Sequence, residues 1–237
     1  MLPLLAAPFI GSFLGVLIRR LPAGRPVAMA RSACETCGRT LQPAEMVPLL
    51  SHAFQRGRCR GCSVLIGRFH WIVELAAVAV ALMVVASAPP EEVWADCALG
   101  WTLLALGWID WEHQRLPDAL TLPLVVAGLG VTWVQDPDGL LDHAVGAVLG
   151  YAAFRLISNV YRASRGHDGL GHGDAKLLAA AGAWVGLSQL NQVVLLGALA
   201  TIGVVLWQAR GKGLSGRLAS PFGPGLAIAL MVVRLRG

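Results

Sequence analysis

Two aspartates, Asp110 and Asp174, stand at the ends of long apolar runs, where a charge is costly unless it serves a function. Asp110 lies in LALGWIDWEHQRLPDALTLP, and Asp174 lies in GLGHGDAKLL at residues 169–178. Taken singly, each acid is better explained as a helix cap or a loop residue, since Asp is a favoured N-cap. Two carboxylates a few ångströms apart, however, would share one proton, so that one accepts a proton from water and the other donates to a carbonyl oxygen. Together the two acids therefore predict aspartic-protease chemistry.

Other polar or small residues near these acids have two possible roles each. Gly171 and Gly173 would let backbone or substrate approach Asp174 closely, because glycine has no side chain. Lys176 either tunes the acid pair or extends its amine to the membrane interface, and the second is slightly favoured. Glu74, inside an apolar run, is either a polar contact for the loop before it or part of a second site, with weak potential for binding a cofactor.

Four cysteines form a second cluster with metal-binding spacing. CETC at residues 34–37 and CRGC at residues 59–62 give the pattern C-x2-C-x21-C-x2-C, which is close to that of structural zinc sites. Cys34, Cys37, Cys59 and Cys62 would supply four thiolates and close a tetrahedral Zn²⁺ site with no open position for catalysis. Two redox pairs or free thiols are the alternative. The fifth cysteine, Cys97, lies in an apolar run and is expected to pack.

Membrane-spanning helices must position both clusters. Of the 237 residues, 56% are hydrophobic and only 14% are charged, whereas about a quarter are charged in soluble domains. About 20 apolar residues span a bilayer as a helix. The sequence predicts an all-α polytopic membrane protein with eight spans, or seven if the short sixth segment is not one. The segments are 2–18, 71–88, 94–110, 118–134, 142–161, 175–188, 190–207 and 219–234.

The basic residues predict the orientation of these helices. With the N-terminus outside, all Lys and Arg residues except Arg155, Arg234 and Arg236 lie in or beside the inside loops, as the positive-inside rule requires. The inside loops are 19–70, 111–117, 162–174 and 208–218. Asp110 and Asp174 then lie at the same face of the membrane. Membrane lipid explains the basic loops better than nucleic acid does, so no nucleic-acid partner is expected.

Several blocks of this sequence resemble the bacterial type IV prepilin peptidases, also called prepilin leader peptidase/N-methyltransferases. The similarity runs nearly end to end and in order. The blocks are GSFLGVLIRRLP (11–22), the paired CETC and CRGC, VPLLSHAFQRGRCRGC (47–62), IDWEHQRLPDALT (109–121), GLGHGDAKLLAAAGAWVG (169–186) and SPFGPGLAIAL (220–230). A lone GxGD would be weak evidence, but these blocks together are specific.

The resemblance implies an eight-helix GxGD aspartic protease of the bacterial inner membrane, with a periplasmic N-terminus and Asp110 and Asp174 as its catalytic pair at the cytoplasmic face. It implies prepilin or pseudopilin substrates, whose basic leader is cleaved after a Gly, and methylation of the new N-terminus with S-adenosylmethionine. It also implies a small zinc-binding, methyltransferase-associated cytoplasmic domain over residues 19–70, between a first helix at 1–18 and a peptidase domain at 71–237. The sequence departs from the family pattern at Gly15, Glu35 and Met46, all in the part linked to methyl transfer.

Two other functions are compatible with the acids alone. A proton- or cation-coupled transporter would also place ionisable residues within membrane helices, but it does not explain the cysteine cluster. A zinc-stapled membrane scaffold without chemistry would need neither aspartate.

Overall fold

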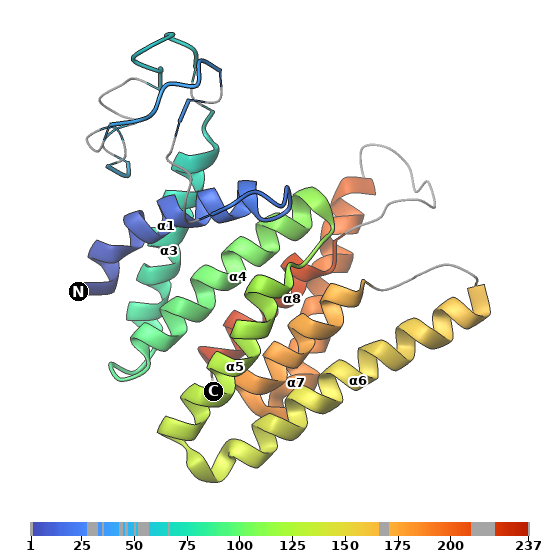
Figure 1. The fold of residues 1–237 in the computed structure, drawn as a ribbon. Helices are drawn as coiled ribbons and strands as arrows, with labels where there is room; N and C mark the ends of the chain where they lie inside the picture. Colours follow the sequence, from blue (N-terminus) through green and yellow to red (C-terminus); the bar gives the residue numbers. More distant parts are fainter. Residues whose placement is uncertain are drawn as a thin grey trace. The chain divides into compact units, whose positions relative to one another are not determined.

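The computed structural model describes residues 2–27, 33–34, 36–42, 45, 47–49, 51, 57–65, 67–165, 171–209 and 221–236. The described chain is helical and contains no strand, only the two isolated bridges Ala33–Thr40 and Arg58–Leu65. The helices are α1 (Leu2–Arg20), α3 (Phe69–Ser87), α4 (Val93–His113), α5 (Asp118–Gln135), the short 3-10 helix η2 (Pro137–Gly139), α6 (Leu140–Arg165), α7 (His172–Ala209) and α8 (Gly223–Arg234) (Figure 1). The all-helical prediction is thus confirmed.

Five helices are long and apolar enough to cross a membrane, namely α1, α3, α5, a segment that includes η2 and most of α6, and α7. The predicted number of eight spans is not confirmed. Among the described residues, α4 is not one of the five, and it carries Asp96, Asp110 and Glu112 along its length. Helix α8 has 12 residues, which at 1.5 Å each is about 18 Å, short of a hydrocarbon core of about 30 Å.

The chain divides into two compact units, Met1–Ala105 and Leu106–Gly237. In the first unit, α1 packs on α3 where Gly11 faces Glu74, and a Cβ at Gly11 would lie 2.7 Å from the Glu74 Cα. The first part of α4 is joined to α3 by a hydrogen bond of 2.9 Å from Trp101 Nε1 to the Ala77 carbonyl oxygen. Glycine at position 11 thus permits a close contact between α1 and α3.

In the second unit, α7 lies against α5, α6 and α8 (Figure 1). Small residues make its contact with α6 close. A Cβ at Gly182 would stand 2.2 Å from the Gly146 carbonyl carbon, and one at Gly150 would stand 2.9 Å from the Leu178 carbonyl oxygen. Membrane helices associate through such close backbone packing, because lipid is as apolar as the side chains and supplies no hydrophobic drive.

Helix α7 is interrupted at Gly186, where φ is 75° and ψ is 171°. The Leu187 N–H donates to Asp142 Oδ2 at 3.0 Å, and His143 Nδ1 lies 3.0 Å from the Ala183 carbonyl oxygen. These are the two groups that an unbroken helix would pair with each other, so consecutive residues of α6 satisfy both ends of the break. The predicted segments 175–188 and 190–207 correspond to the two arms of α7, and the break falls at Gly186, within the first of them.

Candidate active site and metal centre

Asp110 lies in the last turn of α4, and its side chain is buried, with 5% of the residue exposed. Its Oδ2 accepts a hydrogen bond of 2.9 Å from the backbone N–H of Gly223. Gly223 is the first residue of α8, so its N–H belongs to the set that a helix leaves unpaired at its N-terminus. Helix α8 therefore completes the surroundings of an acid carried by α4.

Asp174 lies in the first turn of α7 and is 8% exposed. Its backbone N–H donates to the Gly171 carbonyl oxygen at 3.1 Å, and its Oδ2 accepts from the Gly171 N–H at 3.2 Å. This reciprocal pairing places Asp174 inside the first turn of α7. Asp174 is therefore not the N-cap residue, which is the role that the helix-cap explanation gave it. The Asp174 side chain is thus fixed by the Gly of its own GxGD motif.

The two acids lie close enough that the charge of Asp110 acts on Asp174. They come from the C-terminal end of α4 and the N-terminal end of α7, which are 64 positions apart in the sequence. Among the described residues, the only buried side-chain nitrogen or oxygen without a hydrogen-bond partner is Nε of Arg39. In each of these bonds the acceptor is Oδ2, so the Oδ1 atom of each aspartate is not engaged by them.

Gly173 lies against the segment that joins α4 to α5. A Cβ at Gly173 would stand 2.7 Å from the Cβ of Leu116, which is itself buried. Contact at this distance is far inside the usual 3.5–4.0 Å between carbon atoms. The absence of a side chain at Gly173 therefore sets how near the start of α7 comes to the end of α4.

Lys176 forms an ion pair with Asp118, at the start of α5. Sequence analysis considered two roles for Lys176, tuning of the acid pair and extension to the membrane interface, and did not predict Asp118 as its partner. A hydrogen bond joins Arg155 Nη1 of α6 to His172 Nδ1. The ion pair is partly exposed, with 26% of the Lys176 side chain and 58% of the Asp118 side chain accessible, so its contribution to stability is small. It does join the N-terminal ends of α5 and α7.

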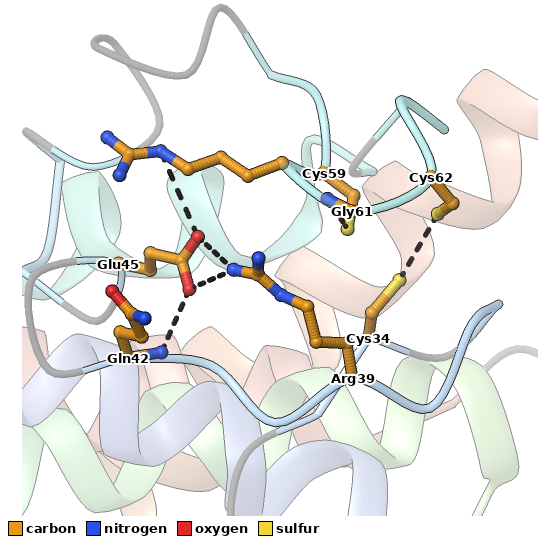
Figure 2. A network of polar contacts seen from close by, with 8 residues as sticks. Cys34, Arg39, Gln42, Glu45, Cys59, Gly61 and Cys62 are labelled. Atoms are coloured by element: carbon orange, nitrogen blue, oxygen red, sulfur yellow. Dashed lines mark hydrogen bonds and ion pairs between the residues drawn. The ribbon is translucent and has the colours of Figure 1, made fainter.

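The four predicted cysteines meet at one place in the first unit. Their sulfur atoms all lie within 4.8 Å of one another, and all are free thiols. The Sγ atoms of Cys34 and Cys62 are 3.9 Å apart (Figure 2). A disulfide would bring two sulfurs to about 2.05 Å, whereas a tetrahedron of zinc–sulfur bonds of about 2.3 Å has edges of about 3.8 Å. The cluster can therefore hold a metal ion.

The two CxxC segments have the same local fold. In the first segment, the Cys34 N–H donates to the Arg39 carbonyl oxygen, and the Gly38 N–H donates to the Cys34 carbonyl oxygen. In the second segment, the Cys59 N–H donates to the Val64 carbonyl oxygen, and the Ser63 N–H donates to the Cys59 carbonyl oxygen. The residue after each second cysteine, Gly38 or Ser63, has positive φ. Backbone N–H groups of Cys37 and Thr36 lower the pKa of the Cys34 thiol to about 6, and those of Cys62 and Gly61 lower the pKa of Cys59. These N–H groups favour the thiolate form at Cys34 and Cys59, whereas the pKa of the Cys62 thiol is raised to about 11.

A polar network lies beside the sulfurs (Figure 2). The Glu45 carboxylate, 1% exposed, pairs with the Arg39 guanidinium and accepts a 2.8 Å hydrogen bond from the Gln42 N–H, which with Arg39 lowers the pKa of Glu45. Arg60 Nε approaches the same carboxylate at 3.9 Å. Arg39 follows the first CxxC segment, and Arg60 lies within the second. Glu45 thus ties the two segments together, a role that the sequence reasoning missed.

Glu74 makes a contact with the loop and is not placed by any observation in a second site. Its Oε2 accepts a hydrogen bond of 2.8 Å from the Leu49 N–H, and Leu49 has φ 60°. Glu74 therefore holds the backbone of the loop that precedes α3.

Of the three departures from the family pattern, Gly15 is described, and a Cβ there would lie 2.5 Å from His70 Nδ1. Glu35 and Met46 lie outside the described residues.

Comparisons with known proteins cover both units. The type IV leader peptidase family matches residues 97–206, and the bacterial peptidase A24 N-terminal domain matches residues 5–88. A prepilin leader peptidase/N-methyltransferase of Burkholderia pseudomallei is 38% identical over 92% of this chain and 79% of its own length. Proteins of the same name from Aeromonas hydrophila and Pseudomonas aeruginosa are 36% and 34% identical, each over 96% of this chain and 87% of their own length. No solved structure matches.

These similarities confirm the resemblance drawn from the sequence blocks, and they give the transporter alternative no support. They extend over both the part with the cysteine cluster and the part with Asp110 and Asp174. The chain belongs to the type IV leader peptidase family.

Proposed function

We propose that this protein is a prepilin leader peptidase/N-methyltransferase, which cleaves the basic leader of a prepilin or pseudopilin after a Gly and then methylates the new N-terminus. The observation that carries the peptidase assignment is the meeting of Asp110 and Asp174, two buried acids from different helices, each held by the N–H of a glycine. Family membership and the names of the relatives support both activities.

In the proposed reaction, the acid pair carries one proton. The ionised aspartate takes a proton from water, whose oxygen bonds to the carbonyl carbon, while the protonated aspartate donates to the carbonyl oxygen. The tetrahedral intermediate then loses its carbon–nitrogen bond. The first aspartate gives the proton that came from water to the leaving amine and is ionised again. As the carbonyl re-forms, a hydroxyl group of the intermediate returns a proton to the second aspartate, so the pair again carries one proton. The products are a carboxylic acid and a free amine, and no metal ion is needed.

The site is suited to a substrate that enters from the membrane interface. A prepilin is a basic leader followed by an apolar helix, so its scissile bond lies where water and lipid meet. Asp110 and Asp174 lie at helix ends, where water has easier access than at the bilayer centre. We place the protein in the bacterial inner membrane with its N-terminus in the periplasm and this site at the cytoplasmic face.

We assign Zn²⁺ to the four cysteines as a structural ion. The thiol-only donor set and the 3.9 Å separation of two sulfurs support this ion. Bound zinc would leave four thiolates with a net negative charge, and the positive charge of Arg39, which interacts with Cys59 and Cys37, would offset part of it. The ion would link the two CxxC segments of the proposed cytoplasmic domain, residues 19–70, and take no part in peptide cleavage.

S-adenosylmethionine would supply the methyl group for the second activity. The amine to be methylated exists only after the leader has been removed, so cleavage must come first. Glu74 is assigned to the loop contact with Leu49 and not to the methyl donor.

Mass spectrometry of a co-expressed prepilin tests both activities at once. We expect wild type to yield a pilin that has lost its leader and gained 14 mass units at its N-terminus, about one methyl group. Asp110→Asn and Asp174→Asn should leave the full-length prepilin, and Asp138→Asn, which changes an exposed acid on η2, should behave as wild type. Normal cleavage by either site variant would refute the dyad, and a cleaved but unmethylated pilin would refute the second activity.

A further inference from the structure

We propose that Gly223, through its backbone N–H, is a positioning residue for Asp110, so that the first turn of α8 is a third element of the active site. This inference rests on the proposed peptidase function. It concerns the SPFGPG segment, for which sequence analysis found only similarity to the family. Among the described residues, the backbone N–H of Gly223 is the one donor hydrogen-bonded to the Asp110 carboxylate.

The first argument is the contact itself. The Gly223 N–H donates to Asp110 Oδ2 at 2.9 Å inside a buried site. A Cβ at Gly223 would stand 2.6 Å from that oxygen, 2.9 Å from Cγ and 3.2 Å from Cβ of Asp110. The backbone of Gly223 therefore lies along the whole carboxyl group, and any side chain at this position would displace the acid.

The second argument is that α8 is held by its neighbours. The ring of Phe222, the residue before Gly223, packs on Phe154 of α6 with 5.9 Å between ring centroids. One turn before Asp110, a Cβ at Gly107 would contact the Cα of Pro224 at 3.7 Å. A Cβ at Gly225 would stand 2.7 Å from the Gly197 carbonyl oxygen of α7. The first turn of α8 thus lies against α4, α6 and α7, which fixes the direction of the Gly223 N–H.

The third argument is the parallel between the two acids. Each offers Oδ2 to one glycine N–H, Gly171 for Asp174 and Gly223 for Asp110. A carboxylate held by one oxygen can rotate less, so each glycine N–H restricts the orientation of its acid. For Asp174 the donor lies in the same turn of chain, whereas for Asp110 it comes from a helix more than 100 residues away. The alternative is that Gly223 only permits close packing of α8.

Purified full-length variants with a synthetic prepilin peptide in detergent micelles separate these possibilities. Gly223→Ala should lower kcat on the order of 100-fold, since a displacement of about 1 Å at a catalytic group has that effect, with KM within about threefold of wild type. It should also change the pH dependence of kcat, because the surroundings of one titrating acid change. Gly128→Ala is the matched control: it crowds α5 against the Trp184 ring of α7 at 2.7 Å, without touching Asp110 or the first turn of α8.

The expected result is that Gly128→Ala lowers the unfolding temperature but keeps the pH profile of wild type. If Gly223→Ala keeps the kcat and pH profile of wild type, or if Gly128→Ala reproduces all its effects, the positioning role is wrong. Should Gly223→Ala not fold, Phe154→Leu tests the same link without adding an atom to α8: about tenfold lower kcat at unchanged KM supports it, and unchanged kcat overturns it. Normal cleavage by Asp110→Asn would instead refute the proposed function itself.

Discussion

Replacing Gly173 by alanine should strongly reduce peptide cleavage while leaving the protein folded. The new Cβ would lie 2.7 Å from the Cβ of Leu116, and carbon atoms prefer 3.5–4.0 Å, so the start of α7 and the α4–α5 connection must separate by about 1 Å. Leu116 cannot avoid this by changing rotamer, because the atom concerned is its Cβ. Asp174 is the next residue after Gly173, so the separation passes directly to the acid pair.

A displacement of about 1 Å costs on the order of 100-fold in rate, or about 2.7 kcal/mol in activation free energy. The assay is kcat on a prepilin peptide in proteoliposomes, with folding checked by thermal unfolding in detergent. Gly203→Ala provides the control, because Gly203 is also in α7 and its added Cβ would meet nothing within 4 Å. If Gly173→Ala cleaves within about threefold of Gly203→Ala, the close approach of Gly173 and Leu116 does not set the geometry of the acids.

Three further outcomes follow from other contacts. Gly186→Ala should destabilise the protein by about 1–3 kcal/mol, because the φ of 75° and ψ of 171° at this position suit only glycine. Thermal unfolding measures this loss, with Gly130→Ala as the control, because a Cβ at Gly130 would meet nothing within 4 Å. Equal unfolding temperatures for the two variants would contradict the prediction. Cys34→Ser should lose the bound zinc and expose the cysteine segments to protease, since structural zinc contributes folding energy. Metal analysis that finds full zinc content would count against the site, and immediate loss of cleavage when a chelator is added to folded wild type would count against a purely structural role. Glu74→Leu should speed exchange of the Leu49 amide hydrogen about 10- to 150-fold, because a hydrogen bond to a charged acceptor is worth about 1.5–3 kcal/mol; an unchanged exchange rate would mean that this bond does not hold the loop.

Apolar run length predicts most of the helices, because a bilayer needs long apolar segments and leaves few alternatives. It fails where short-range composition does not determine the outcome. The residues around Gly186 are apolar on both sides, and the break there depends on Asp142 and His143 of α6, which satisfy the freed backbone groups. Similarly, the apolar stretch before Arg234 predicts a span over 219–234, whereas the described helix begins at Gly223 and is too short to cross alone.

The candidate site divides in the same way. The cysteine cluster could be found from sequence, because two CxxC segments determine their own local fold and their spacing is specific. The meeting of Asp110 and Asp174 could be anticipated only from predicted topology and resemblance. The groups that hold them were partly missed: Gly171 is adjacent in sequence, but the bond from Gly223 joins residues 113 positions apart, and no local pattern specifies it. The Gly-Pro-Gly at the start of α8 was the available signal.

The most direct measurement of the central claim is cleavage of a purified prepilin by wild type, Asp110→Asn, Asp174→Asn and Asp138→Asn, each reconstituted in liposomes and matched for folding and zinc content. If Asp110 and Asp174 share the proton for hydrolysis, each of these two variants should lose at least about 1,000-fold in kcat, the double variant should lose no more, and Asp138→Asn should match wild type. Cleavage within tenfold of wild type by Asp110→Asn or Asp174→Asn would contradict the account.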